Sequence, residues 1–283
     1  MSQPRSRSYL VFISALMIGC ATPPKSEFAT FAQVGTGYAV AVDKLLSAAG
    51  TAQVDSTSWT LVVERRVTGM DDKTYSDKNR SDLSRLEQIS RLRQHAQLLG
   101  QYFGLLEALA SSDAPERTKA SIEGIVSELN NLRQGMPPLV SALPQIGSVA
   151  VDFKIRLALR EELDKRKDVI REHLTIQEQM LQELNKQIKH ALSLSKEAQE
   201  QILVIEPILS KTSLKDSEEW VSTRRRVVYT SLTIDELGKA RQAATKLREV
   251  FEGLISGEAT IGRLNALITD IESMLSVAEA IKP

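Results

Sequence analysis

The sequence predicts an all-α protein, an elongated antiparallel helical bundle with coiled-coil character and no sheet. Aromatic residues make up only 5% of the chain, while Leu, Ala, Gln, Glu, Lys and Arg, which favour helices, are abundant. Apolar residues recur at alternating steps of three and four, which is the spacing of one helix face. In addition, the 59 residues from Ser148 to Glu206 contain neither glycine nor proline, which favours one very long helix.

The first helix is expected to begin near Ser26, which can cap it, with Glu27 in its first turn. Residues 55–66 are expected to form a second helical piece. The polar stretch 67–81 has no apolar period and is expected to be a loop. Gly35-Thr-Gly37 follows no strand, so helix packing explains it better than a phosphate loop does. The apolar positions of the first helix are Phe28, Phe31, Gly35, Tyr38, Val42, Leu45 and Ala49.

The next helix carries two adjoining apolar stripes, a face wide enough to contact two neighbours in a bundle. Gly100 and Gly104 have the G-x-x-x-G spacing, and close charged residues favour approach of a neighbouring helix over a membrane contact. Asp113 and Pro115 predict the cap and first turn of the following helix. The two stripes are Ile89, Leu92, Ala96, Leu99, Phe103, Leu106 and Ala110, and Leu98, Tyr102, Leu105 and Leu109.

The glycine-free helix would span roughly 85 Å if straight. Arg166, Gln177 and Ser195 interrupt its apolar seam and indicate a kink or a change of partner there. Pro207 is expected to end this helix or to kink it. The seam consists of Ile155, Leu159, Leu163, Ile170, Leu174, Leu181, Leu184, Ile188, Leu192, Ile202 and Ile205.

A second long helix is expected to start at Thr212 or Ser213 and to continue to Leu254, and a last helix follows it. Short connections between long helices make neighbours antiparallel. Residues 26–283 are therefore expected to form a single elongated bundle. The apolar positions of the last helix are Ile261, Leu264, Ile268, Ile271, Leu275 and Ala278.

The chain begins with the layout of a bacterial export signal. Arg5 and Arg7 precede an uncharged run near ten residues long, which is too short to cross a bilayer. Leu16-Met17-Ile18-Gly19-Cys20 then resembles a lipoprotein lipobox, with Met17 where that family usually has Leu. The resemblance implies a signal peptide at residues 1–19 and lipid attachment, including palmitate, at Cys20. Cleavage without lipidation and an uncleaved anchor are the alternatives.

The lipobox resemblance also implies a location in the cell. Several acyl chains on one cysteine hold a protein firmly at a membrane. The expected protein is therefore membrane-anchored and extracytoplasmic, with the lipid bilayer as its first partner. Ala21 follows the cysteine, which in diderm bacteria resembles sorting to the outer membrane, facing the periplasm. The tether at residues 20–25 reaches about 20 Å when fully extended, so the helical body is expected close to the bilayer.

Charge and residue patterns argue against several functions. Without residues 1–19 the chain has 34 basic and 36 acidic residues, so no basic excess favours nucleic acid. His173 and His190 lie roughly 25 Å apart along one helix, too far for one metal ion, and all three histidines are expected beside the core. Ser193-Leu-Ser-Lys196 matches the S-x-x-K spacing of penicillin-recognising enzymes without their other motifs. We therefore expect no enzyme, cofactor, metal or small-molecule substrate.

Two segments are candidate contact sites. Arg224, Arg225 and Arg226 fan around a helix, where they form either a solvated or ion-paired face or a contact for an anion or a partner. Residues 134–151 carry no charged side chain, and three prolines break them. This segment is an apolar connector, a partner-docking surface or a membrane-touching tip. Its candidate contact residues are Leu139, Val140, Leu143 and Ile146.

The leading functional hypothesis is a non-enzymatic envelope lipoprotein. It is expected to be a helical rod that presents a side surface or its far end to a protein partner of unknown identity. The alternative is a membrane-active, pore-forming-like helical protein that inserts residues 134–151. An enzyme whose site is assembled across several helices is the third hypothesis.

Overall fold

The computed structural model describes residues 25–67, 69, 71–111, 115–134, 156–210, 216–236, 238–258 and 261–281. Within these ranges all regular structure is helical, which confirms the all-α bundle. The elements are α1 (Lys25–Val67), α2 (Asp72–Ser111), α3 (Pro115–Gln134), α4 (Arg156–Gln199), the π-helical η1 (Glu200–Ile205), α5 (Glu206–Leu209), α6 (Ser217–Glu236), α7 (Gly238–Ser256) and α8 (Ile261–Ile281).

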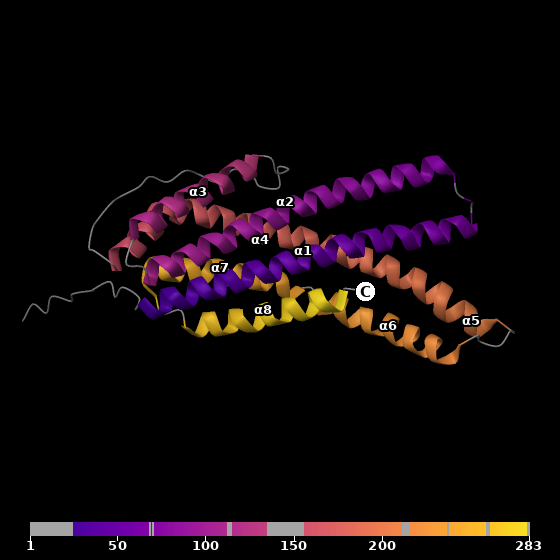
Figure 1. The fold of residues 1–283 in the computed structure, drawn as a ribbon. Coiled ribbons are helices and arrows are strands. Elements are labelled where there is room, and N and C mark those ends of the chain that lie inside the picture. Colours follow the sequence, from indigo (N-terminus) through magenta and orange to yellow (C-terminus); the bar gives the residue numbers. More distant parts are fainter. Residues whose placement is uncertain are drawn as a thin grey trace, which may run out of the picture.

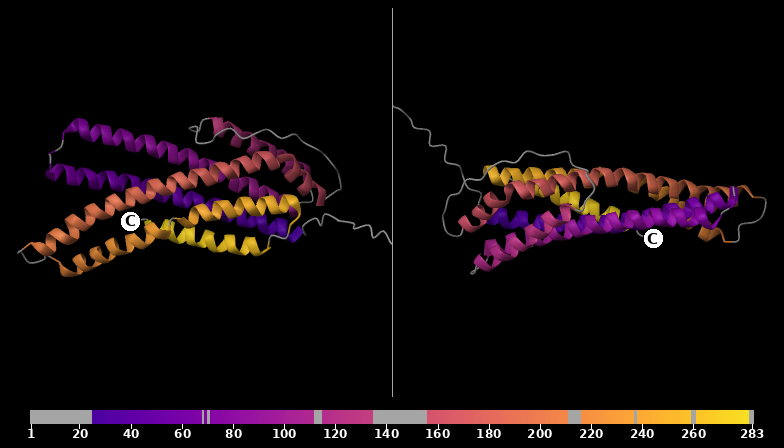
Figure 2. Two further views of the ribbon diagram at one scale, coloured as in Figure 1. Left: turned by 180° about the vertical axis from the view of Figure 1, so that it is seen from behind. Right: turned by 90° about the horizontal axis from the view of Figure 1, so that it is seen from above.

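The bundle is elongated, and α1, α2 and α4 run along most of its length (Figure 1). Helices α1 and α2 form an antiparallel hairpin, in which Asp43 pairs with Arg93 at 2.9 Å and Glu64 pairs with Lys78 at 3.1 Å. Glu178 of α4 binds Arg248 of α7 at 3.0 Å. Helix α8 then lies along α1 and α7 (Figure 2).

Helix α3 is parallel to α4, whereas α7 is antiparallel to it. Lys119 near the start of α3 pairs with Glu161 at 3.1 Å, and Arg133 near its end pairs with Glu172 at 2.8 Å. The antiparallel rule applies to helices joined by short connections, and 21 residues separate α3 from α4. The chain therefore enters α4 at the end of the bundle where α3 began.

One continuous core joins α1, α2, α3, α4, α7 and α8. Phe31 of α1 lies at its aromatic centre, with its ring 5.4 Å from that of Phe103 and 6.0 Å from that of Phe251. All seven apolar positions expected for α1 are buried, because a period of three and four places them on one face. In α8 the prediction is partly wrong: Ile261 and Ile268 are exposed, while Leu267 and Met274 are buried.

The first loop is much shorter than expected. Helix α1 is continuous through residues 55–66, and α2 already begins at Asp72, so the loop predicted over 67–81 is wrong. Asp71 caps α2 by accepting the backbone N–H of Thr74 at 2.7 Å. Further along, the buried Asp82 accepts the hydroxyl of Thr57 at 2.8 Å. Polar contacts hold this part of α2 against α1, so no apolar period marks it.

The ends of the later helices also differ from expectation. Pro207 does not end the long helix, because the π-helical η1 carries it into α5 as far as Leu209. The N–H of Glu206 bonds to the carbonyl oxygen of Gln201, five residues back. Asp216 caps α6 by accepting the N–H groups of residues 218 and 219, both at 2.9 Å, so the caps predicted at Thr212 or Ser213 are wrong. The helix predicted to Leu254 consists of α6 and α7.

Two glycines let helices approach closely and two do not. A Cβ on Gly35 would lie 2.6 Å from Cγ of Phe103, and one on Gly100 would lie 3.0 Å from Cβ of Ala39. A Cβ on Gly37 or Gly104 would meet nothing within 4 Å. The packing interpretation is therefore confirmed for the first pair and wrong for the second.

We expect Gly35→Ala to lower the free energy of unfolding by about 1–3 kcal/mol, because the added methyl group overlaps a buried ring. The matched control is Gly37→Ala, two residues away on the same helix. It should raise stability by about 0.5–1 kcal/mol, since alanine favours the helix and nothing obstructs it. Urea unfolding of the chain from Ala21 onward, followed by circular dichroism, measures both. Equal effects would contradict this packing of α1 on α2.

Candidate functional site

Most of the sequence-predicted contact residues lie outside the described residues. These are Cys20, Leu139, Val140, Leu143 and Ile146. Arg224, Arg225 and Arg226 are described, and all three are exposed on α6. None forms an ion pair with another described residue, so their role in binding an anion or a partner stays a prediction.

Trp220, one turn before these arginines, holds α6 in place. Its indole N–H donates to the carbonyl oxygen of Val204 in η1 at 3.1 Å. A π-helical turn leaves a carbonyl free for such a contact. The arginine run therefore projects from a helix that is fixed to the end of the α4 rod.

The least expected feature of the core is a pair of buried histidines. Nε2 of His95 in α2 lies 2.9 Å from Nδ1 of His173 in α4. On its other side, Nδ1 of His95 lies 2.6 Å from the side-chain nitrogen of Gln177. Both imidazoles are fully buried. The expectation that His95 and His173 flank the core is therefore wrong, whereas His190 is exposed.

These contacts form a chain of hydrogen bonds through the core, from Gln177 to His95 to His173. Gln177 donates to Nδ1 of His95, so that ring carries its proton on Nε2 and donates it to His173. The remaining proton of His173 lies on Nε2, which has no hydrogen-bond partner among the described residues. Turning over the amide of Gln177 reverses every donor in the chain. In either direction both rings are neutral.

Burial keeps the two rings neutral. Together with a smaller contribution from the neighbouring His173, it lowers the pKa of His95 to about 3. Burial likewise lowers the pKa of His173 to about 4, with a contribution from the positive charge of Arg133. A charged imidazolium would lose its hydration here without gaining a carboxylate. This pair joins α2 to α4 and offers no proton to a substrate at neutral pH.

A buried ion pair lies two turns along the same face of α4. Arg166 donates to Glu162 at 3.1 Å and to Glu123 of α3 at 2.6 Å. Glu162 is 3% exposed. Burial raises the pKa of its carboxyl, and Arg166 offsets part of that rise. The interruptions predicted at Arg166 and Gln177 are thus places where α4 contacts α3 and α2, and the helix continues through both.

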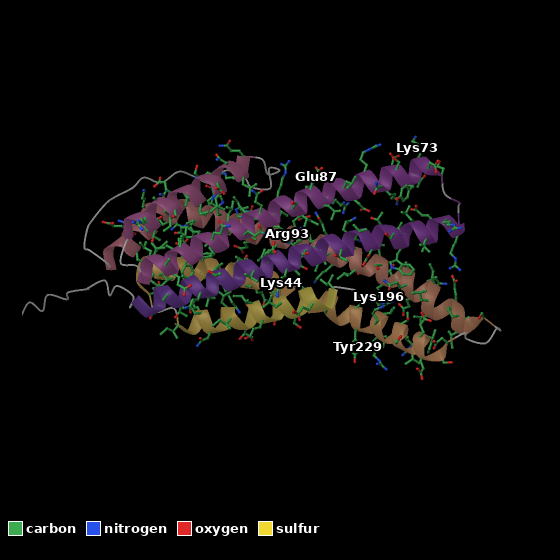
Figure 3. All side chains as sticks on the ribbon, in the orientation of Figure 1. Lys44, Lys73, Glu87, Arg93, Lys196 and Tyr229 are labelled. Carbon is green, nitrogen blue, oxygen red and sulfur yellow. The ribbon has the colours of Figure 1, made fainter. Side chains whose placement is uncertain are left out.

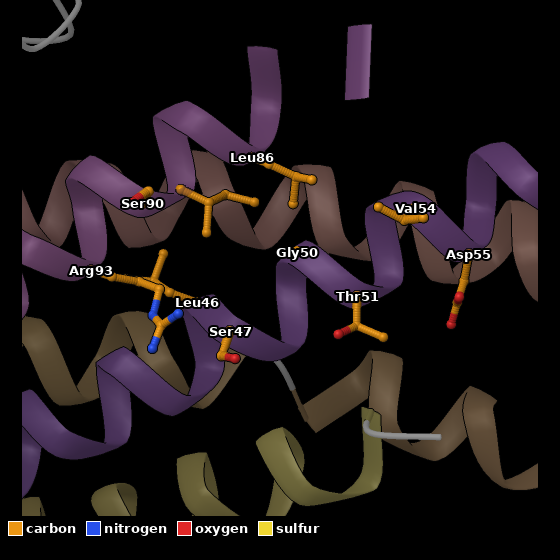
Figure 4. Close-up of a pocket in the computed structure, with 10 residues that line it drawn as sticks. Leu46, Ser47, Gly50, Thr51, Val54, Asp55, Leu86, Ser90 and Arg93 are labelled. Atoms are coloured by element: carbon orange, nitrogen blue, oxygen red, sulfur yellow. The ribbon is translucent and has the colours of Figure 1, made fainter. Parts of the chain in front are cut away.

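The surface of the bundle has several hollows between helices. One of about 420 Å³ lies between α1 and α2, where Leu86 faces Gly50 and Arg93 lies near Leu46 (Figure 4). Another of about 420 Å³ lies where α1, α4, α6 and α8 meet, beside Lys196 and Tyr229 (Figure 3). Each contains a single carboxylate, Asp55. Neither offers the paired acids that general acid–base catalysis uses.

The remaining patterns suit a structural role. Within the described residues, no three His, Cys, Asp or Glu side chains are placed to hold a metal ion. Lys196 of the S-x-x-K pattern pairs with Glu200 at 3.3 Å, one turn along its own helix. Ser195, not Ser193, is the buried serine there, and it accepts a hydrogen bond from Gln199 at 2.8 Å.

Comparison with known proteins gives no assignment. No family model, no curated protein and no solved structure matches this chain. Among the described residues, no helix combines the length and the apolarity that crossing a membrane requires.

The histidine pair makes stability depend on pH. In the unfolded chain each histidine titrates near pH 6.5, whereas the folded pKa values are lower. Below about pH 6.5 the unfolded chain binds more protons, so stability falls with pH until the folded pKa values are reached. At pH 5 each of the two buried histidines should lower the free energy of unfolding by roughly 2 kcal/mol relative to pH 7.

The free energy of unfolding falls between pH 7 and pH 5. We expect this fall to be about 4 kcal/mol smaller in the double variant His95→Leu/His173→Leu than in the wild type. Urea unfolding at the two pH values measures this difference. The control is His190→Gln, which removes an exposed histidine from the same helix and should keep the wild-type dependence. A double variant with unchanged pH dependence would contradict the buried pair.

The ion pair makes a separate prediction. Arg166→Met should lower the free energy of unfolding by about 3 kcal/mol, because Glu162 keeps its burial and loses its cation. Adding Glu162→Leu should restore most of that loss, since no unpaired charge is left. Chemical unfolding of the two single variants and the double variant measures the coupling. Additive effects of the two substitutions would show that the pair is not formed.

Proposed function

We propose that this chain is a lipid-anchored, extracytoplasmic helical protein that binds another protein and has no enzymatic role of its own. Its address follows from the lipobox resemblance at Cys20. In a diderm bacterium Ala21 favours the outer membrane, with the bundle in the periplasm.

The observation that carries the proposal is the direction of α1. The helix begins at Lys25, five residues after Cys20, and its 43 residues rise by roughly 65 Å to the other end of the bundle (Figure 1). A lipid at residue 20 would hold one end of the rod at the bilayer. The opposite end, with α5 and the start of α6, would then reach away from the membrane.

The surface remote from residue 25 has the composition of a contact surface. Leu209 of α5 is 76% exposed, and Val221, Val228 and Tyr229 of α6 are each about half exposed. The three exposed arginines, 224–226, lie between these apolar side chains on α6. Exposed apolar side chains grouped with arginine and tyrosine are typical of protein interfaces.

The interior supports a structural role. The buried histidines and the buried Arg166–Glu162 pair contact side chains of neighbouring helices. These buried side chains hold the helices of the rod together. The hollows described above lack paired carboxylates. The membrane-active alternative depends on residues 134–151, of which all but Gln134 lie outside the described residues, so it stays a prediction.

Metabolic labelling with an alkyne analogue of palmitate tests the anchor. We expect the wild-type chain to incorporate the label and to fractionate with membranes. Cys20→Ser should incorporate none and should lose membrane retention, because the sulfur that carries the lipid is missing. Ser26→Ala is the control with an intact cysteine. Mass spectrometry that finds residues 1–19 intact and Cys20 unacylated would contradict the proposal.

A further inference from the structure

Helix α3 covers only the first half of the groove between α2 and α4. Its buried face, with Ile122, Val126 and Leu129, packs into the core. Its flanks pair with α4 through Glu161, Arg166 and Glu172, as described above. Helix α3 ends at Gln134, beside Glu172, whereas α4 continues for 27 more residues.

The same faces of α2 and α4 continue past the end of α3. On α2 the stripe of Leu109, Leu105, Tyr102 and Leu98 leads at steps of three and four to His95, Arg91, Gln88 and Arg85. Here α2 and α4 diverge in both Figure 1 and Figure 2. We call this open half the α2–α4 groove and define it by the residues that line its two hollows. They are Asp77, Arg80, Ser81, Ser84, Arg85, Gln88, Ile89, Arg91 and Leu92 of α2, Met180, Glu183, Leu184, Gln187, Ile188 and Ala191 of α4, and Ala49 and Gln53 of α1.

The groove has an apolar floor and the length of a helix. Its floor includes the buried Met180, Leu184 and Ile188. The two hollows have volumes of about 250 and 610 Å³ and share Arg85, Gln88 and Gln187, so they are continuous. Together they follow α2 from Asp77 to Leu92, which is roughly 22 Å, or four turns of helix.

The two walls differ in charge. Arg80, Arg85 and Arg91 line the α2 wall, where Asp77 is the one carboxylate and pairs with Arg80 at 3.2 Å. Arg85 donates to the neutral amide oxygen of Gln53 at 3.0 Å. On the α4 wall, Glu183 pairs with Lys186 at 3.0 Å, which leaves that wall neutral. Arg85 thus has a neutral partner only, and it favours a ligand with acidic side chains toward α2.

The sequence from Gln134 to Val151 contains no acidic side chain, so it does not supply the acidic residues that Arg85 favours.

We propose that the α2–α4 groove binds an amphipathic helix of a partner protein, with an apolar face on Leu184 and Ile188 and acidic residues against Arg85. Helix α3 shows what the covered half of the groove accepts, because it is itself an amphipathic helix with apolar residues below and ion-pairing flanks. The partner helix would extend the layer that α3 begins. This inference rests on the proposed function and names the surface through which it operates.

Photo-crosslinking of the full-length chain in its native envelope tests the proposal. A photoreactive residue replaces Gln88 or Gln187, one on each wall, and Lys44 on the exposed face of α1 serves as the background position (Figure 3). We expect both groove positions, and not Lys44, to yield the same protein adduct. The crosslinked peptide should carry apolar residues at helical spacing and Asp or Glu along one edge.

A charge reversal supplies the second readout. Arg85→Glu should reduce the adduct at Gln187 at least about tenfold, because it places like charges against the acidic edge. Lys73→Glu makes the same change on α2 outside the groove and should leave the yield unchanged. Circular dichroism of both variants verifies folding. An unreduced adduct in a folded Arg85→Glu protein would overturn the proposal.

A third position separates this inference from the proposed function. Adducts at Val228 on α6, with none at Gln88 and Gln187, would overturn the groove and leave the proposed function standing. Adducts at the groove positions to lipid alone, or to a second copy of this chain, would also overturn the proposal that the groove binds a partner helix. An unacylated Cys20 together with no protein adduct at any position would end both.

Discussion

The arrangement of the bundle depends on the polar stripe that α4 buries. Leucine and isoleucine seams hold helices together, but burial of apolar surface has no direction, and such seams tolerate a shift of one turn. Glu162, Arg166, His173 and Gln177 do not tolerate it, because each needs one particular partner. A shifted helix would leave buried polar groups unpaired, at a cost of about 1–3 kcal/mol for each neutral group and more for each charge. The stripe therefore fixes the register of α2 and α3 against α4.

The same stripe divides the molecule into two halves. From Glu162 to Gln177, α4 contacts α2 and α3 directly, and this compact half lies at the end where α1 begins. Beyond Gln177 the two helices diverge, and the groove opens between them. A protein held at residue 20 would thus keep its rigid half near the bilayer. Its open surfaces would lie farther out, where another protein can reach them.

The sequence predicted what depends on local periodicity. The apolar faces of α1 and α4 were predictable because their residues recur at helical spacing along one segment. The interruptions at Arg166 and Gln177 were also visible, yet their partners were not. His95 and His173 are 78 residues apart, and only the packing of two helices brings them together. The start of α2 was missed because its contacts with α1 are polar and follow no apolar period. The groove was invisible for another reason: it is defined by the residue at which α3 stops.

The most direct test of the central claim is nitrogen NMR of the imidazole rings across a pH titration. Lipid-free protein from Ala21 onward, with ¹⁵N-labelled histidine, serves for the measurement. If the stripe fixes the register as described, His95 and His173 stay neutral down to about pH 5 and show a coupling through the hydrogen bond between Nε2 of His95 and Nδ1 of His173. Titration of His95 or His173 near 6.5, with no coupling between the rings, would contradict it.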